Sequence, residues 1–182
     1  MSKNTGKVFE STIKSNAPSY LKVTRIPDPP QSFTQREDTR FSKKNPYDFE
    51  CFDSIHRINY CLELKSVGQK YLTYHTCEED EKKKKSANIK WHQIEGLTKA
   101  SEYDNVIAGF LLNFRLDRRE QLLYFLNIKD FNKFRKSTTK KSLNIMDTVL
   151  YGGIKINGEK LKVNYRWNLD EFLEFQSKTC PL

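Results

Sequence analysis

The sequence lacks the long apolar run that a membrane-spanning helix requires. A helix needs about 18 or more consecutive apolar residues to cross a bilayer, and no stretch of this chain approaches that length. The segment Met1 to Lys7 leads into no apolar stretch of the kind that a secretory signal carries. We therefore expect a cytoplasmic protein with no membrane partner.

Cysteine is scarce, and its spacing is irregular. The chain has Cys51, Cys61, Cys77 and Cys180, with no Cys-x-x-Cys pair among them. A chain of 182 residues can build a hydrophobic core without disulfide staples, so free thiols are expected. The His75-Thr76-Cys77 segment is followed by no second pair at ligand spacing, which argues against a structural zinc site.

Negative charge is the third shortage. The chain carries 32 Lys and Arg against 23 Asp and Glu, a formal net charge of +9. Such an excess favours a polyanionic partner, because each phosphate that Lys or Arg neutralises releases condensed counterions. A basic protein with no such partner is the alternative that charge alone leaves open.

What is present is enough apolar material for one packed domain over residues 1–182. Hydrophobic residues make up 37% of the chain and aromatic residues 13%, which excludes global disorder and suits a single core of this size. Two polar segments interrupt the pattern: residues 31–46 are expected to be a projecting basic arm or loop, and residues 76–87 a solvated, charged loop.

Hydrophobic periodicity predicts an α/β protein. Apolar residues at helical spacing or in alternation, bounded by turn residues, define the elements. Helices are expected at 6–15, at 88–101 with Ser86 as the N-cap, and at 130–136, 144–150 and 169–176; strands are expected at 20–26, 48–52, 58–65, 106–114, 121–128 and 161–167.

The candidate chemistry lies on the two strands that follow the arm. Alternation along the second strand puts Glu63 and Lys65 on one face, and Asp48, at the start of the preceding strand, can bring a second carboxylate to the same end of the sheet. Two carboxylates provide the hard oxygen ligands of Mg²⁺, and the lysine can hold a water molecule or neutralise a phosphate. The alternative is that Glu63 and Lys65 form the solvent face of an edge strand.

Several segments together resemble the RecU-type Holliday junction resolvases. The similarity lies in Gly6-Lys7-Val8-Phe9-Glu10, Ile26-Pro27-Asp28-Pro29-Pro30, Phe41-Ser42-Lys43-Lys44-Asn45-Pro46-Tyr47-Asp48, Leu62-Glu63-Leu64-Lys65 and His92-Gln93-Ile94, and covers roughly residues 6 to 135. The resemblance implies a restriction-endonuclease-like PD-(D/E)xK core, a mixed central sheet flanked by helices. It also implies a homodimer that makes paired nicks across four-way DNA junctions with Mg²⁺ or Mn²⁺, in a bacterial or phage-infected cell.

The resemblance assigns a role to each matching residue. Asp48 and Glu63 would bind the metal, Lys65 would be the catalytic lysine, Glu10 a first-helix carboxylate near the metal, and Gln93 a side chain directed at the active site. His92 is expected to pack or to form hydrogen bonds rather than to act as a base. The arm residues Arg36, Arg40, Lys43 and Lys44 would contact DNA. Leu111, Phe125 and Leu126 are candidates for the dimer interface, with a place in the core as the alternative that the sequence leaves open.

Two further hypotheses stay open at this stage. The first is a nuclease with the same core that acts on other DNA in restriction, nicking or repair. The second is a non-catalytic DNA-binding accessory protein of recombination that keeps the basic surface. The charged segment 76–87 is longer, and the arm shorter, than the resemblance implies, which bears on junction selectivity more than on cleavage.

Overall fold

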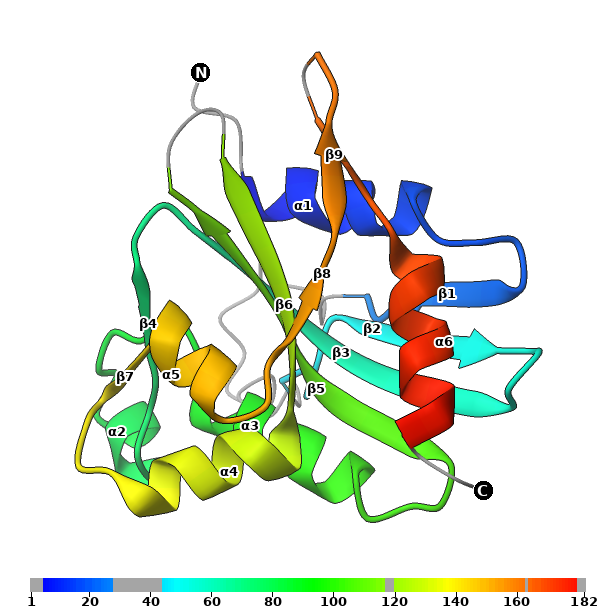
Figure 1. The fold of residues 1–182 in the computed structure, drawn as a ribbon. Coiled ribbons are helices and arrows are strands. Elements are labelled where there is room, and N and C mark those ends of the chain that lie inside the picture. The colour runs from blue at the N-terminus through cyan, green and yellow to red at the C-terminus, as the bar shows by residue number, and fades with distance from the viewer. Residues whose placement is uncertain (1–4, 28–43, 117–119, 163, 180–182) are drawn as a thin grey trace, which may run out of the picture.

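A computed structural model of the protein describes residues 5–27, 44–116, 120–162 and 164–179. The elements follow one another as an α/β arrangement (Figure 1). None of the helices within these ranges combines the length and the apolar character needed to cross a membrane. The cysteines in these ranges, Cys51, Cys61 and Cys77, are free thiols, as the sequence predicts.

A six-stranded mixed sheet in the order β1-β2-β3-β5-β6-β8 forms the centre of the molecule. All neighbouring pairs are antiparallel except β3 and β5, which run parallel. Two small sheets flank it, one of β4 with β7 and one of β9 with β10. The strands are β1 (Leu21–Arg25), β2 (Phe49–Asp53), β3 (Ile58–Val67), β4 (Tyr71–Thr73), β5 (Val106–Arg115), β6 (Gln121–Asn127), β7 (Ser142–Asn144), β8 (Ile154–Ile156), β9 (Gly158–Lys160) and β10 (Tyr165–Trp167).

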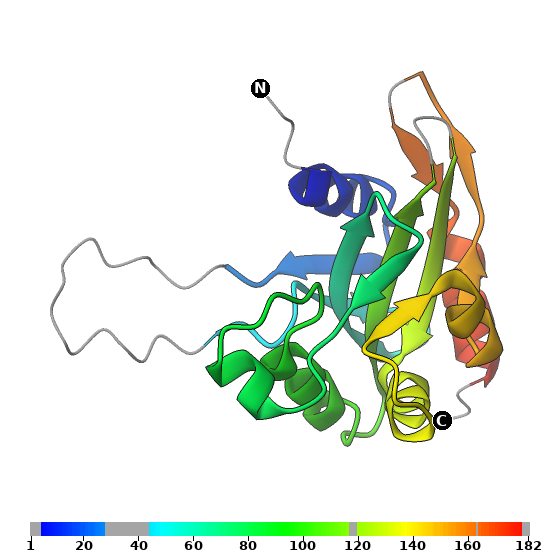
Figure 2. The ribbon, with the colours of Figure 1, turned by 90° about the vertical axis from the view of Figure 1, so that its left-hand side faces the viewer.

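Helices cover both faces of this sheet. They are α1 (Thr5–Ser15), α2 (Glu78–Lys82), α3 (Trp91–Ala100), α4 (Ile128–Ser137), α5 (Ile145–Leu150) and α6 (Leu169–Thr179). Buried residues of α1 and α6 pack on one face of the sheet, and those of α3 and α4 pack on the other. Figure 2 shows β1 between α1 and the α2–α3 pair. The predicted mixed central sheet with flanking helices is thereby confirmed.

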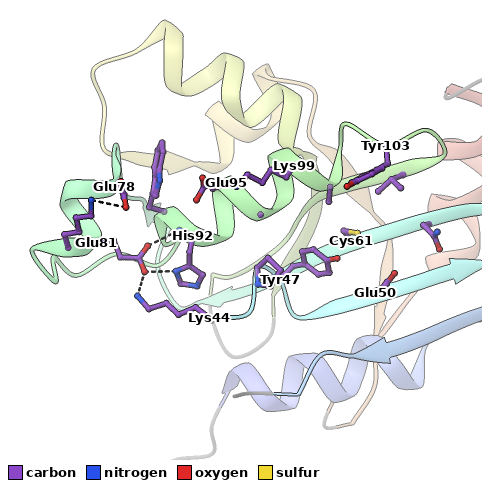
Figure 3. A pocket seen from close by; sticks show the side chains of 17 residues that line it. Lys44, Tyr47, Glu50, Cys61, Glu78, Glu81, His92, Glu95, Lys99 and Tyr103 are labelled. Carbon is purple, nitrogen blue, oxygen red and sulfur yellow. Dashed lines mark hydrogen bonds and ion pairs between the residues drawn. The ribbon is translucent and has the colours of Figure 1, made fainter. Parts of the chain in front are cut away.

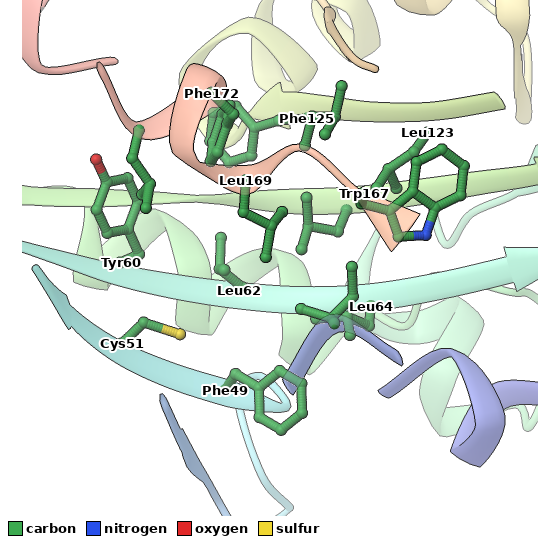
Figure 4. Packing of buried hydrophobic residues seen from close by; sticks show 14 of the residues in the cluster. Phe49, Cys51, Tyr60, Leu62, Leu64, Leu123, Phe125, Trp167, Leu169 and Phe172 are labelled. Atoms are coloured by element: carbon green, nitrogen blue, oxygen red, sulfur yellow. The ribbon is translucent and has the colours of Figure 1, made fainter. Parts of the chain in front are cut away.

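Two hydrophobic clusters hold these layers together. One joins the sheet to α1 and α6, with Phe9 among its buried members. Leu62 and Phe172 of the same cluster are seen in Figure 4. The other joins it to α3 and α4 through Leu97 and Phe131. Side chains that follow one another along β3 point to opposite faces of the sheet, so Leu62 packs in the first cluster and Cys61 in the second.

Most predicted elements are present with shifted ends, but one helix cap and one strand differ from the prediction. Helix α3 begins at Trp91 with Lys90 as its N-cap, so Ser86 is not the cap. The strand predicted at 161–167 is reduced to β10, because the N–H of Leu161 donates to the carbonyl oxygen of Asn164 and closes the β9–β10 hairpin. The short strands β4, β7, β8 and β9 were not predicted.

Candidate active site

The β2–β3 hairpin brings two carboxylates to one face of the sheet. Phe49 pairs with Leu62 across the hairpin, so Asp48, which directly precedes β2, lies one step further along, opposite Glu63. Directly opposed residues share a face. The Oδ2 atom of Asp48 accepts a hydrogen bond of 2.8 Å from the backbone N–H of Leu64, which fixes the orientation of that carboxylate.

Lys65 and Gln93 both contact the carboxylate of Glu63. The Nζ atom of Lys65 lies 2.7 Å from Oε1 of Glu63, and Nε2 of Gln93 donates a 2.5 Å hydrogen bond to the same oxygen. The Glu63 side chain is 3% exposed and that of Lys65 17% exposed. The structure therefore brings together four of the predicted residues, and Glu63 is not on the solvent face of an edge strand.

The start of α3 determines where Gln93 points. Its Oε1 atom accepts a 2.9 Å hydrogen bond from the N–H of Lys90, while its Nε2 donates to Glu63. Both ends of the amide are thus used, one to cap the helix and the other to orient Glu63. This half of a capping box satisfies the backbone N–H of the N-cap residue.

Burial dominates the electrostatics of both carboxylates. It raises the pKa of Glu63 to about 7, with the neighbouring charge of Asp48 adding to the rise and Lys65 opposing it. Burial also raises the pKa of Asp48, against the hydrogen bond from Leu64 and the charge of Lys65. A cation bound between the half-buried Asp48 and the buried Glu63 would favour the ionised form of both carboxylates.

These side chains line a cavity of about 200 Å³. Its walls are formed by Lys44, Asn45, Tyr47, Asp48, Glu63, His92 and Gln93. Six of the seven lie in two short segments, 44–48 and 92–93, and Glu63 comes from the strand between them.

Glu81 supports the wall of this cavity and was missed by the sequence prediction. Its Oε1 accepts from Nζ of Lys44 at 2.5 Å and from Nδ1 of His92 at 2.7 Å, and its Oε2 accepts from the N–H of His92 at 2.9 Å. The expectation that 76–87 is a solvated loop was wrong, because this segment contains α2 and the buried Asp80, which binds Thr76 and Lys85. His92 forms hydrogen bonds, in agreement with its predicted role.

Glu10 lies close to the site but is engaged elsewhere. Its Oε2 forms a 2.8 Å ion pair with Nε of Arg25, at the end of β1. The negative charge of Glu10 nevertheless contributes to raising the pKa values of both Asp48 and Glu63. Glu10 therefore acts on the site through its charge and not through a contact with either carboxylate.

The donor set of the cavity fits a hard divalent cation. Within the described ranges, no group of three His, Cys, Asp or Glu side chains is placed to hold a metal ion. Asp48 and Glu63 would thus provide two ligands and water the rest. Such partial coordination suits Mg²⁺, which is commonly held by one or two carboxylates and keeps several water molecules.

Most of the predicted arm lies outside the described residues, including Arg36, Arg40 and Lys43. Lys44 is described, and its Nζ pairs with Glu81 at the rim of the cavity. The Nδ2 atom of Asn45 donates to the carbonyl oxygen of Pro27 at 2.8 Å. The flanks of the segment 28–43 are therefore tied together beside Asp48.

The fold and this site define an α/β protein with two carboxylates and a lysine on adjacent strands of a mixed sheet. No known family profile matches the chain. It is 33% identical to the SPbeta prophage-derived uncharacterized protein YotM of Bacillus subtilis strain 168, over 98% of this chain and 92% of that protein. The chain belongs to the same family as that prophage protein.

Proposed function

We propose that this protein is a metal-dependent endonuclease that cuts branched DNA, with four-way junctions as its substrate. The observation that carries the proposal is that Asp48 and Glu63 line one cavity, with Lys65 paired to the carboxylate of Glu63. An ordinary exposed Glu-x-Lys pair would need neither burial nor the amide of Gln93.

The residues of the site divide the work of phosphodiester hydrolysis among them. Asp48 and Glu63 would hold Mg²⁺ or Mn²⁺, which when bound supplies a Lewis acid for the phosphate and lowers the pKa of a water molecule. The N–H of Leu64 and the amide of Gln93 keep the two carboxylates in place. Lys65 brings a positive charge that can bind a phosphate oxygen or orient the attacking water.

Three further features support this reading. The net charge of +9 favours a polyanionic substrate. The mixed sheet with helices on both faces agrees with the PD-(D/E)xK core that the resemblance to RecU-type resolvases implies. The relative from Bacillus subtilis is prophage-derived, in keeping with a branch of such enzymes encoded by mobile elements.

The two alternatives differ from this proposal in substrate and in chemistry. A nuclease of the same core that acts on linear DNA would use the same three residues, whereas a recombination accessory protein would bind DNA without cutting it. The burial of Glu63 beside Lys65 favours a catalytic role, because a protein that only binds DNA has no need of a buried carboxylate.

The experiment is cleavage of a synthetic four-way junction and of a linear duplex, with Mg²⁺ or Mn²⁺. Wild-type protein should nick the junction in preference to the duplex. Asp48→Asn and Glu63→Gln should abolish nicking and leave binding in gel-shift assays unchanged, because Lys and Arg contacts to phosphate provide most of the affinity. Glu159→Gln, which alters an exposed carboxylate on β9, is the matched control and should cleave normally.

Each other outcome selects an alternative. Equal cleavage of both substrates would favour a general nuclease of this core. Binding without cleavage by wild-type protein, with either metal, would favour the accessory protein. If both carboxylate variants keep more than a few per cent of wild-type nicking, the assignment of the site is wrong.

A further inference from the structure

A groove of about 740 Å³ adjoins the active-site cavity (Figure 3). It lies between the α2–α3 pair and the β2–β3 hairpin, and it shares Lys44, Tyr47 and His92 with the cavity. Its volume is in the range of pockets that bind small organic molecules. A ligand that enters the cavity can therefore extend directly into the groove.

The charges of the groove are matched among themselves. Each of its lysines forms an ion pair with a glutamate of the same groove: Lys44 with Glu81 at 2.5 Å, Lys82 with Glu78 at 3.0 Å and Lys99 with Glu95 at 3.3 Å. Glu50 adds a fourth carboxylate to the lining. Three lysines against four glutamates give a formal charge of −1 in a chain whose total is +9. The groove is therefore a poor site for phosphate.

Aromatic rings provide the remaining recognition surface. Tyr47, Trp91 and Tyr103 all line the groove, and Tyr103 is 72% exposed. The guanidinium of Arg135 lies 5.0 Å from the centre of the Trp91 ring and holds that ring in place. Tyr103, the exposed ring, lies at the end of the groove away from Lys44 and His92, whereas Tyr47 is shared with the cavity (Figure 3). Rings spaced along a groove suit the bases of a single strand, which stack on aromatic side chains whatever their sequence.

We propose that the groove binds the unpaired nucleobases that follow the cleaved phosphate along one strand, an inference that rests on the proposed nuclease function. Because the groove has no surplus positive charge, it favours bases over phosphates. Because it shares a wall with the cavity, those bases belong to the strand that is cut. The side chains of Glu50 and Asn59 add hydrogen-bond acceptors to the lining. Carboxylate and amide oxygens accept from the exocyclic amines of bases, so amine-bearing bases should bind better than thymine.

Trp91 offers a direct readout, because the chain has two tryptophans and the other, Trp167, is buried in the opposite cluster. Trp167→Phe leaves Trp91 as the single reporter. Titration with single-stranded tetranucleotides in EDTA, where no cleavage takes place, should quench its fluorescence. Oligo-dA and oligo-dC should bind more tightly than oligo-dT.

Tyr103→Ala, in the Trp167→Phe background, should weaken binding by about fivefold or more, the loss expected for one stacked base. Tyr71→Ala is the matched control, since Tyr71 is also an exposed tyrosine, at 46%, but lies outside the groove. If Trp167→Phe fails to fold, a tetranucleotide that contains 2-aminopurine serves as the probe. The quenching of its fluorescence on binding then gives the affinity of Tyr103→Ala and of Tyr71→Ala, each made in the otherwise native chain.

The outcomes separate this inference from the nuclease proposal. Equal affinity for an abasic tetranucleotide, or equal losses in Tyr103→Ala and Tyr71→Ala, would overturn the base-binding groove. Junction cleavage without any quenching leaves the nuclease and removes the groove. Quenching that depends on Tyr103, in a protein that cuts no DNA, leaves a base-binding groove and removes the nuclease.

Discussion

Glu81 is the single residue that ties the most parts of the site together. It joins α2 to Lys44 at the cavity rim and to the backbone and side chain of His92 on α3. Burial alone would raise the pKa of this carboxyl, but the hydrogen bonds from Lys44 and His92 outweigh it and lower the pKa to about 2. The ionised form of Glu81 is therefore part of the folded structure.

This shift predicts how acid acts on the fold. Because the folded-state pKa is about 2 and the ordinary value is 4.5, ionised Glu81 stabilises the protein fully above pH 4.5, and that contribution is lost as pH falls from 4.5 towards 2. Glu81→Gln should lower the free energy of unfolding near pH 6, and its deficit relative to wild type should shrink below pH 4.5. Urea unfolding at several pH values measures this difference.

Glu78→Gln is the control for that series. Glu78 belongs to the same helix, but its ion pair with Lys82 is exposed on both sides and should contribute little to stability. A deficit of Glu81→Gln that stays constant from pH 6 to pH 3 would show that its hydrogen bonds do not depend on the ionised carboxylate.

Sequence alone predicts a site residue where a short-range pattern, such as the alternation of a strand, fixes the face on which its side chain lies. Alternation along one strand puts Glu63 and Lys65 on a common face, and the start of the preceding strand of the hairpin adds Asp48. Gln93 came from the resemblance alone. Glu81 could not be found in this way, since its contacts with Lys44 and His92 depend on how α2 packs and not on spacing.

Helix α3 shows the same limit for whole elements. The N–H of Trp91 donates to Nδ1 of His75 at 3.3 Å, and the N–H of His92 donates to Glu81. Side chains from outside the helix therefore satisfy its first backbone donors, and Lys90 stands at the cap although lysine is no preferred cap residue. A prediction from local sequence chose Ser86 because it could not include these partners.

The close packing of α3 on the segment before β2 leads to a prediction about Gly96. A Cβ atom at this position would lie 2.2 Å from Cβ of Pro46 and 3.0 Å from its Cα. Alanine is the better helix former by about 1 kcal/mol, but the clash with backbone outweighs this gain. Gly96→Ala should cost about 1–3 kcal/mol in unfolding free energy and, by displacing Asp48, slow cleavage by about tenfold or more.

Gly68→Ala tests whether any added methyl group has this effect. Its Cβ would lie 3.5 Å from Nη2 of Arg115, an ordinary contact, so stability and cleavage should stay near wild type. Denaturant unfolding and junction nicking, measured on both variants, compare the two. Wild-type nicking by Gly96→Ala would mean that the position of Asp48 does not depend on α3.

The longer elements were predictable and the shortest were not, for a physical reason. Strands such as β3 and β5 carry enough apolar residues to reveal their period. The three-residue strand β4 exists only because β7, some 70 residues later, pairs with it between Leu72 and Leu143. Pairing over such distances leaves no periodic signal in either segment.

For the molecule as a whole, the predicted dimer interface has to be corrected. Leu111, Phe125 and Leu126 are at most 1% exposed and belong to the two hydrophobic clusters. Their apolar character serves the packing of the sheet against its helices. A dimer, if formed, uses other residues.

Dimerisation itself remains a prediction from the proposed function. One chain holds one site, and opposed nicks in a four-way junction require two, related by a two-fold axis like that of the substrate. Light scattering at micromolar concentration should give the dimer mass, alone or with junction DNA. Dimers that combine wild-type and Glu63→Gln subunits should nick one strand and rarely complete resolution. A monomer under both conditions would contradict this model and favour a simple nicking enzyme.

The sheet combines strand pairs that are close in the sequence with pairs that are distant, and this difference bears on the order in which they form during folding. The β2–β3 hairpin closes between Asp53 and Ile58 with Arg57 in the left-handed conformation, and local hairpins form within about 1–10 μs. In the parallel β3–β5 pair, Glu63 lies opposite Phe110. Contacts between residues so far apart in the sequence form more slowly. We therefore expect Asp48 and Glu63 to meet early in folding, while still in water, and to be enclosed later. Substitutions in the hairpin should change the refolding rate, and substitutions in α3 mainly the unfolding rate.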